Sequence, residues 1–275
     1  MLSNKYLGDY LLQLEIYNFA MRLRGMNMGC RRIRRAIIEA YNKEVPEKTI
    51  SGWISGRHHP LGNTVKFRKC PELGYVAGGW FGDGSKIYRY NNGHRQYRLT
   101  LRVVDYDFAE AWGRAAAIAT GKAQPYKPLP IKEDYSKKFG HKPRWQVAFC
   151  NVLLFQILDK NDPWKAYELL ELYSYPEATL SGFFDADGWA SKKAYVYAEN
   201  TNYDLLLMMQ ELASTINIHS RVYAKTKKNK RGKRQKYILV IYKKDSVINF
   251  YRKVGFKIRR KQAKLINLMR EKKWI

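Results

Sequence analysis

Two stretches with the same pattern decide how this chain folds: VAGGWFGDG at residues 76–84 and LSGFFDADG at residues 180–188. Each runs from an apolar residue through two small residues into a bulky segment, and each ends in Asp-Gly. The second copy begins 104 residues after the first. A motif that recurs inside one chain indicates a structural unit that is present twice.

The sequence after each copy is also alike. Strand-like alternation comes first, as at 189–199 after the second copy, and a helical pattern follows. Two further strands come next, the first of them at 123–131 after the first copy, and then another helical pattern. This order predicts an α+β fold of two pseudo-symmetric αββαββα units with antiparallel sheets. The expected division is a helical domain at 1–60, a linker at 61–71, and the two units at 72–175 and 176–275.

Small residues recur four positions apart in each motif. Gly78 and Gly82 share one stripe of a helix, as do Gly182 and Ala186. Small residues at this spacing let two helix backbones approach closely. We therefore expect the two motifs to be helices that pack against each other about a pseudo-twofold axis.

Such packing would bring Asp83 and Asp187 together at the helix ends. A carboxylate at a helix C-terminus opposes the macrodipole, and two adjacent carboxylates repel each other. A hard divalent cation between them would remove both penalties, and Mg²⁺ is typically held by one or two carboxylates. The alternative is that Asp-Gly only ends each helix as a turn signal, although its occurrence in both copies favours the metal site.

The charge of the chain predicts a polyanionic partner. Its 51 Lys and Arg residues outnumber 24 Asp and Glu, for a net charge of +27. Nucleic acid is the first candidate and an anionic membrane the second. We expect no transmembrane helix and no signal peptide, and therefore a cytoplasmic (prokaryotic) or organellar protein. The three cysteines match neither a disulfide framework nor a zinc site.

The first 60 residues predict three helical segments that resemble a helix-turn-helix DNA-binding unit. Lys48, Thr49 and Ser51 lie on the polar outer face of the third segment, and four arginines crowd the start of the second. A small helical bundle with basic, solvated faces is the alternative interpretation.

The two motifs resemble those of single-chain LAGLIDADG homing endonucleases, with the first copy more diverged at Phe81. The resemblance covers about residues 72–268. It implies that Asp83 and Asp187 bind metal, with backbone oxygens of Gly82 and Ala186 as further ligands. The implied cofactor is Mg²⁺, for which Mn²⁺ can substitute.

The resemblance also implies a basic catalytic residue near the closing helix of a unit. Arg259 best matches that position, and Lys261 is close to it. A polar residue at the end of the second strand of each unit matches Asp105 and Glu199 only weakly.

Strands of both units carry basic and aromatic side chains that we expect to contact DNA in the major groove. Eleven basic residues and no acidic one lie between residues 219 and 244. The candidates of the first unit are Lys86, Tyr88, Arg95, Tyr97, Arg98 and Arg102. The candidates of the second unit are Lys192, Lys193, Arg221, Tyr223, Lys225, Lys227, Lys228, Lys230, Arg231 and Arg234.

Together these features predict a monomeric, site-specific endonuclease that cuts both strands of a long asymmetric DNA target by metal-dependent hydrolysis. No splicing signature is seen, so we expect an intron-encoded or free-standing enzyme. The alternative is a non-cleaving binder, either a maturase that folds intron RNA or a helix-turn-helix regulator.

Overall fold

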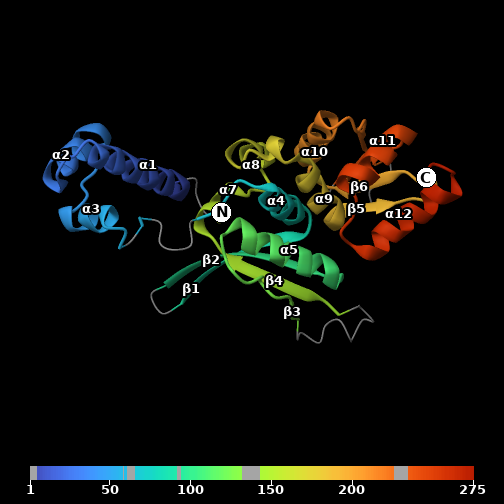
Figure 1. Cartoon of the computed structure of the whole chain (residues 1–275), viewed down its shortest axis with the longest axis horizontal. Helices are drawn as coiled ribbons and strands as arrows, with labels where there is room; N and C mark the ends of the chain where they lie inside the picture. Colours follow the sequence, from blue (N-terminus) through green and yellow to red (C-terminus); the bar gives the residue numbers. More distant parts are fainter. Residues whose placement is uncertain (1–4, 58, 61–65, 92–93, 132–142, 226–234) are drawn as a thin grey trace. The chain divides into compact units, whose positions relative to one another are not determined.

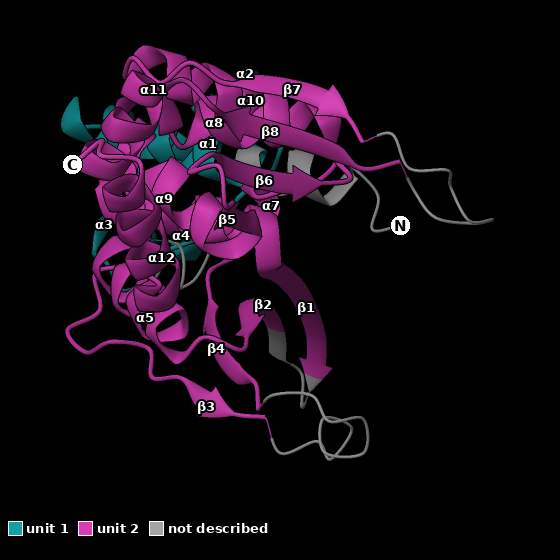
Figure 2. Cartoon of the chain, turned by 90° about the vertical axis from the view of Figure 1, so that its right-hand side faces the viewer, with its two compact units in different colours: residues 1–66 teal, residues 67–275 magenta. Residues whose placement is uncertain are grey.

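The computed structural model describes residues 5–57, 59–60, 66–91, 94–131, 143–225 and 235–275. The chain forms two compact parts, called here the N-terminal domain (residues 1–66) and the main body (residues 67–275) (Figures 1 and 2). The predicted linker at 61–71 falls partly on residues outside the described ranges.

The N-terminal domain consists of the helices α1 (Lys5–Gly25), α2 (Cys30–Tyr41) and α3 (Glu47–Ile54). Its core contains Ile33 and Ile37 from α2 and Ile50 from α3, all fully buried. Trp53 packs edge-on against Tyr17 of α1. The three helices therefore enclose a hydrophobic core of their own.

The main body begins with helix α4 (Pro71–Asp83), which contains the first motif and starts the first αββαββα unit. It continues through β1 (Gly84–Asn91), β2 (His94–Val103), α5 (Tyr106–Ala119), β3 (Leu129–Pro130), β4 (Trp145–Cys150), α7 (Val152–Ile157), α8 (Pro163–Leu169) and η1 (Leu172–Ser174). These four strands form sheet A, an antiparallel sheet in the order β1-β2-β4-β3.

Helix α9 (Pro176–Asp187) contains the second motif and starts the same pattern again. The elements that follow are β5 (Gly188–Ala190), β6 (Val196–Asn200), α10 (Tyr203–Thr215), β7 (Arg221–Ala224), β8 (Tyr237–Ile241), α11 (Lys244–Asn249), η2 (Phe250–Val254) and α12 (Arg259–Glu271). Sheet B is antiparallel in the order β5-β6-β8-β7, which matches sheet A strand for strand. The predicted α+β fold of two αββαββα units is confirmed.

Two details differ from the expected strands. The alternation at 189–199 is broken into β5 and β6 because Ala194 adopts a left-handed φ of 60° in a turn closed by Ser191 and Tyr195. The strand expected over 123–131 shrinks to Leu129–Pro130. Proline cannot donate a ladder hydrogen bond, and this segment carries three prolines.

The two motif helices cross in direct backbone contact, as predicted. A Cβ atom on Gly78 would lie 2.0 Å from the carbonyl oxygen of Thr179, and one on Gly182 would lie 2.2 Å from that of Tyr75. Only glycine leaves enough space for this approach. The crossing joins the two αββαββα units of residues 67–275 into a single body with one continuous core.

Helices cover one face of each sheet. Leu99 and Leu101 of sheet A and Ala198 and Leu239 of sheet B point into the core and are fully buried. Figure 2 shows α4, α5, α9 and α12 to one side of the strands of both sheets. The opposite face of each sheet is called here its outer face. Among the described helices, none combines the length and apolar character needed to cross a membrane.

Candidate functional site

The last turns of α4 and α9 bring Asp83 and Asp187 into one site. A Cβ atom on Gly82 would lie 2.3 Å from the Cβ of Ala186 and 3.2 Å from the Cγ of Asp187. Each motif helix ends at its aspartate, and the chain leaves as a strand. The carboxylates therefore stand at the point where the two units meet.

The glycine after each aspartate is needed for the space around it. Gly84 and Gly188 have extended backbones, with φ of −75° and −95°. A Cβ atom at Gly84 would lie 2.3 Å from the ring of Trp80, and one at Gly188 would lie 2.6 Å from the ring of Phe184. Close packing against the preceding aromatic residue, rather than backbone freedom, requires glycine here.

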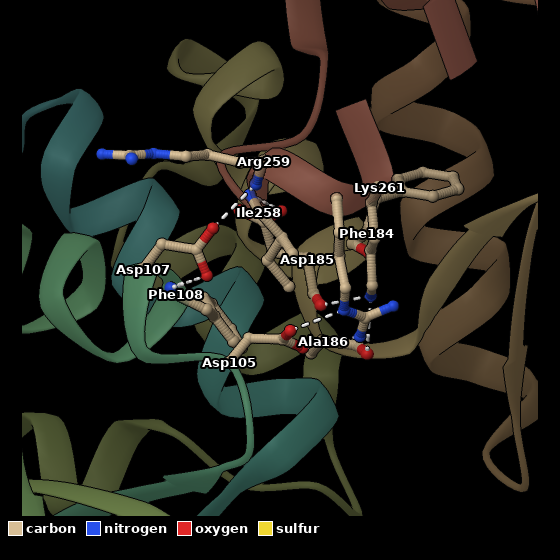
Figure 3. Close-up of polar contacts among 10 residues, drawn as sticks. Asp105, Asp107, Phe108, Phe184, Asp185, Ala186, Ile258, Arg259 and Lys261 are labelled. Atoms are coloured by element: carbon tan, nitrogen blue, oxygen red, sulfur yellow. Dashed lines mark hydrogen bonds and ion pairs between the residues drawn. The ribbon is translucent and has the colours of Figure 1, made fainter. Parts of the chain in front are cut away.

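One lysine from each unit reaches the same site. Lys160 Nζ donates to the carbonyl oxygen of Gly82 at 2.8 Å. Lys261 Nζ donates to the carbonyl oxygen of Asp185 at 2.5 Å and is 3.4 Å from that of Ala186 (Figure 3). The predicted ligand carbonyls of Gly82 and Ala186 thus each face a positive charge.

Arg259 does not take part in this arrangement. Its backbone N–H donates to Asp107 at 2.7 Å, and Figure 3 shows its side chain extending away from Lys261. The reason is helical geometry, because Arg259 and Lys261 both lie in the first turn of α12, where residues two apart point in different directions. Of the two predicted basic residues, the structure brings only Lys261 to the carboxylates.

Asn200, at the end of β6, holds one of the two carboxylates. Its Nδ2 donates to Asp187 Oδ2 at 2.6 Å, and its own Oδ1 accepts from the N–H of Asn202 at 2.9 Å. The weakly matched neighbour, Glu199, instead forms ion pairs with Lys225 and Lys236. Asp105, the weak match of the first unit, binds the guanidinium of Arg260 with both oxygens at 2.6 Å.

Burial sets the electrostatics of the site. It raises the pKa of Asp187 to about 6 and also raises the pKa of Asp83, while the two nearby lysines oppose both shifts. It lowers the pKa of Lys160 and of Lys261. A divalent cation beside the two carboxylates would favour their ionised forms, and it would lower the pKa of the two lysines further.

The donor set fits a hard divalent cation that keeps much of its water. Among the residues that the structure describes, no three His, Cys, Asp or Glu side chains cluster as a closed metal cage. Two carboxylates with adjacent backbone carbonyls are instead the sparse oxygen set that Mg²⁺ accepts when phosphate oxygens and water complete its shell. Asp83, Asp187, Gly82 and Ala186 would hold it.

Asp185 of the second motif is buried and has a structural role. Asp185 accepts hydrogen bonds from the hydroxyl of Tyr75 at 2.7 Å and from the backbone N–H groups of Lys257 and Ile258 at 3.0 and 3.2 Å. These bonds fix the chain just before α12, on which Lys261 stands. Phe81 takes the same place in the first motif and is fully buried instead.

These environments predict opposite stability changes for two similar substitutions in metal-free protein. Asp185→Asn should lower the free energy of unfolding by roughly 1–3 kcal/mol, because an amide would set N–H groups against the donors around it. Asp187→Asn should raise the melting temperature at pH 8, because it removes a half-buried carboxylate whose pKa is raised to about 6. The pKa of Asp185 is also raised to about 6, but the hydrogen bonds from Tyr75, Lys257 and Ile258 outweigh that cost.

The pH dependence has a fixed sign. A carboxyl whose pKa is higher in the folded than in the unfolded state stabilises the fold at low pH and loses that contribution as the pH rises through the folded value. The gain from Asp187→Asn should therefore shrink as the pH falls from 8 to 5. Thermal melts of both variants in EDTA measure this, and equal shifts of the same sign would contradict it.

The predicted DNA contacts of the first unit divide between the two faces of sheet A. Arg98 and Arg102 point to the outer face, as does Arg89, which the sequence analysis did not include. Lys86, Tyr88 and Tyr97 lie on the opposite face, where Lys86 stands 5.1 Å from the ring of Phe155. These three therefore do not share a face with Arg98 and Arg102, because side chains one or three residues apart on a strand face opposite ways, and their contact with DNA stays a prediction. The side chain of Arg95 is outside the description.

In the second unit, Arg221, Tyr223 and Lys225 alternate along β7 and its continuation and share the outer face of sheet B. Lys192 and Lys193 are exposed in the turn between β5 and β6. The remaining candidates, Lys227, Lys228, Lys230, Arg231 and Arg234, lie outside the described residues.

In the N-terminal domain, Lys48 is exposed on α3, while Thr49 and Ser51 are half-buried. Arg34 of α2 forms an ion pair with Glu44. Part of the arginine charge on this domain is therefore matched by acidic partners, and the DNA contacts of this domain stay a prediction.

Sequence reasoning missed Lys160 and Asn200. The 104-residue offset of the motifs carries Lys160 to within three positions of Lys261, so the repeat itself held a signal for the first. Asn200 had no such signal, because Val103 occupies the equivalent strand position in the first unit.

Comparisons with known proteins agree with this architecture. A family model described as a LAGLIDADG-like domain matches residues 174–255. The uncharacterized protein MJ0398 of Methanocaldococcus jannaschii is 30% identical over 267 residues, which cover 93% of each chain. A DNA polymerase of the same organism is 30% identical over 100 residues, or 35% of this chain and 6% of the polymerase.

Among solved structures, the homing endonuclease I-DmoI in complex with DNA and Ca is similar with a TM-score of 0.50 and 15% identity. The match covers 72% of this chain and 97% of I-DmoI. The two-sheet body, the paired motif helices and the family match define a LAGLIDADG-type fold. The chain belongs to the LAGLIDADG family.

Proposed function

We propose that this protein is a site-specific DNA endonuclease that hydrolyses both strands of its target with the help of divalent cations. The observation that carries the proposal is the meeting of Asp83, Asp187, Lys160 and Lys261 where the two motif helices end. The net charge of +27 supports a polyanionic substrate. The DNA and Ca in the similar I-DmoI structure support the same substrate and a divalent ion.

Each group has a part in hydrolysing a phosphodiester by water. Asp83 and Asp187 would hold cations, which supply charge stabilisation for the pentacovalent phosphate and lower the pKa of bound water. Lys160 and Lys261 place positive charge beside the same phosphate, where it stabilises the developing negative charge. Asn200 fixes the orientation of Asp187 through its hydrogen bond of 2.6 Å.

Sequencing of DNA ends tests the proposal. Purified protein and Mg²⁺, with Mn²⁺ in parallel, are incubated with a duplex library, and the ends produced are ligated to adaptors and read. We expect ends of both strands at one recurring sequence, and none in EDTA. Tight binding without new ends would favour the non-cleaving alternatives, a regulator if duplex DNA is retained and a maturase if intron RNA is.

Removal of residues 1–66 should leave a folded nuclease that binds its target more weakly. The remaining residues form a compact unit with its own core. We propose that α2 and α3 act as a tethered second DNA-binding element, which raises affinity through effective concentration. The log-log salt slope of binding should shrink by about 0.9 for each phosphate that the shortened chain no longer neutralises.

Footprinting of the full and shortened chains is the direct measurement. The full chain should protect additional base pairs on one side of the target only, because a single appended unit breaks the pseudo-twofold symmetry. An unchanged footprint and salt slope would show that residues 1–66 do not touch the DNA.

A further inference from the structure

The outer faces of the two sheets have the same strand pairing but different chemistry. The motif glycine begins the first strand in both, with Gly84 paired to Leu101 and Gly188 paired to Ala198. Counting from these pairs gives equivalent positions in the two sheets. The row after the glycine is Ser85–Thr100–Ala148 in sheet A and Trp189–Tyr197–Val240 in sheet B.

The neighbouring rows repeat the contrast. On one side, Arg102 and Gln146 of sheet A correspond to Glu199 and Ile238 of sheet B. On the other side, Arg98 corresponds to Tyr195, while its partner Ile87 corresponds to Ser191 and is the exception. Hydroxyl, amide and guanidinium side chains of sheet A are thus replaced by aromatic and aliphatic ones at most equivalent positions of sheet B, where the tyrosines add a large apolar ring and keep only a terminal hydroxyl.

The aromatic side chains of sheet B lie against one another and present their apolar rings as one surface. The rings of Trp189 and Tyr197 are stacked at 5.5 Å with an angle of 13° between their planes. Tyr195 lies 6.3 Å from both Tyr197 and Tyr242. Trp189 is 36% exposed and Tyr223 is 45% exposed, so the surface is accessible.

Positive charge surrounds this apolar surface. The guanidinium of Arg221 lies 5.3 Å from the centre of the Tyr242 ring. Lys225 and Lys236 flank Glu199 and outnumber its charge, and Lys192 and Lys193 are exposed at the turn beside Trp189. An apolar centre with a basic rim matches a duplex groove, where base edges lie between two rows of phosphates.

We infer that the two sheets read different halves of the DNA target by different chemistry, and that sheet B recognises its half through thymine methyl groups. The C5-methyl of thymine is the one apolar group that a base pair presents in the major groove, and apolar side chains recognise it. Sheet A, with Arg98 and Arg102, suits guanine, whose N7 and O6 accept two hydrogen bonds from arginine. The inference rests on the proposed DNA function.

The test begins with selection of duplexes from a random library by the full chain in EDTA. Selection is repeated with Arg102→Ala and with Tyr197→Thr, which carries the residue of sheet A at that position. The positions whose base preference relaxes with each variant mark the half under each sheet. Thymines of one half at a time are then replaced by uracil, which lacks only the methyl group.

We expect uracil in the half under sheet B to weaken binding by about fourfold for each methyl group that the sheet touches. Uracil in the other half should change binding little, and 7-deazaguanine, which lacks the N7 acceptor, should weaken binding only there. Trp189→Ser combined with Tyr197→Thr should bind thymine and uracil duplexes alike. Tyr173→Thr, at an exposed position outside both sheets, is the matched control and should keep the uracil sensitivity.

Equal effects of uracil in both halves, or none in the half under sheet B, would overturn the inference while leaving the DNA function intact. Failure to enrich any sequence would instead contradict the DNA function and the inference with it. The uracil measurement on the unmodified chain does not depend on whether the double variant folds.

Discussion

Asp187→Asn is expected to give a protein that binds its DNA target but cuts at least one strand roughly a hundredfold more slowly, or not at all. The substitution keeps the volume of the side chain and an oxygen that accepts the hydrogen bond from Asn200. It removes the negative charge that would hold a cation. Asp83→Asn should have the same effect on the other strand, because each motif supplies one carboxylate.

Supercoiled plasmid carrying the selected target measures both strands in one assay. Each single variant should accumulate nicked circles where the parent chain gives linear product, and sequencing should place the two nicks on opposite strands. Glu110→Gln is the control, because Glu110 lies on α5 in an exposed ion pair with Arg114. Linear product from Asp187→Asn at the parental rate would show that this carboxylate has no part in hydrolysis.

Gly182→Ala should strongly destabilise the main body, residues 67–275, because Gly182 of α9 packs directly on the backbone of α4. The added methyl group would lie 2.2 Å from the carbonyl oxygen of Tyr75 and 2.8 Å from the backbone nitrogen of Gly79. Backbone atoms cannot rotate away as a side chain can, so the motif helices must separate along their whole crossing. We expect a loss of stability at or above the upper end of the roughly 1–3 kcal/mol typical of overpacking.

Chemical denaturation followed by circular dichroism measures this change. Gly25→Ala is the matched control, since a Cβ atom there meets nothing within 4 Å. It should leave stability unchanged or slightly improved, because alanine is the better helix former. Parental stability of Gly182→Ala would contradict the close crossing of α4 and α9. Gly182→Leu should abolish folding of the main body.

The sequence predicted the parts of the fold that repetition and spacing determine. Small residues four positions apart, in two copies, were enough to place Gly78 and Gly182 at a helix crossing. The orientation of strand side chains was less predictable. Lys86 and Arg98 look alike in a basic segment, and only the register of β1 with β2 shows that they face opposite sides.

The candidate site was predictable to the same degree. Asp83 and Asp187 belong to the motif, so the repeat identified them directly. Lys160 and Asn200 lie in segments without a motif, and tertiary packing alone brings them to the carboxylates. Arg259 was preferred to Lys261 by position along the chain, whereas the direction of a side chain in the first turn of α12 decides which one reaches the site.

Two sheets of identical strand order in one covalent chain have a consequence for how the target can evolve. Two identical subunits present the same surface patch twice, so a change in one sheet appears in both and the DNA must remain palindromic. In a fused chain, a substitution at Tyr197 leaves Thr100 untouched. Under the proposed function, each half of the recognition sequence can then drift separately, as substitutions alter one sheet at a time.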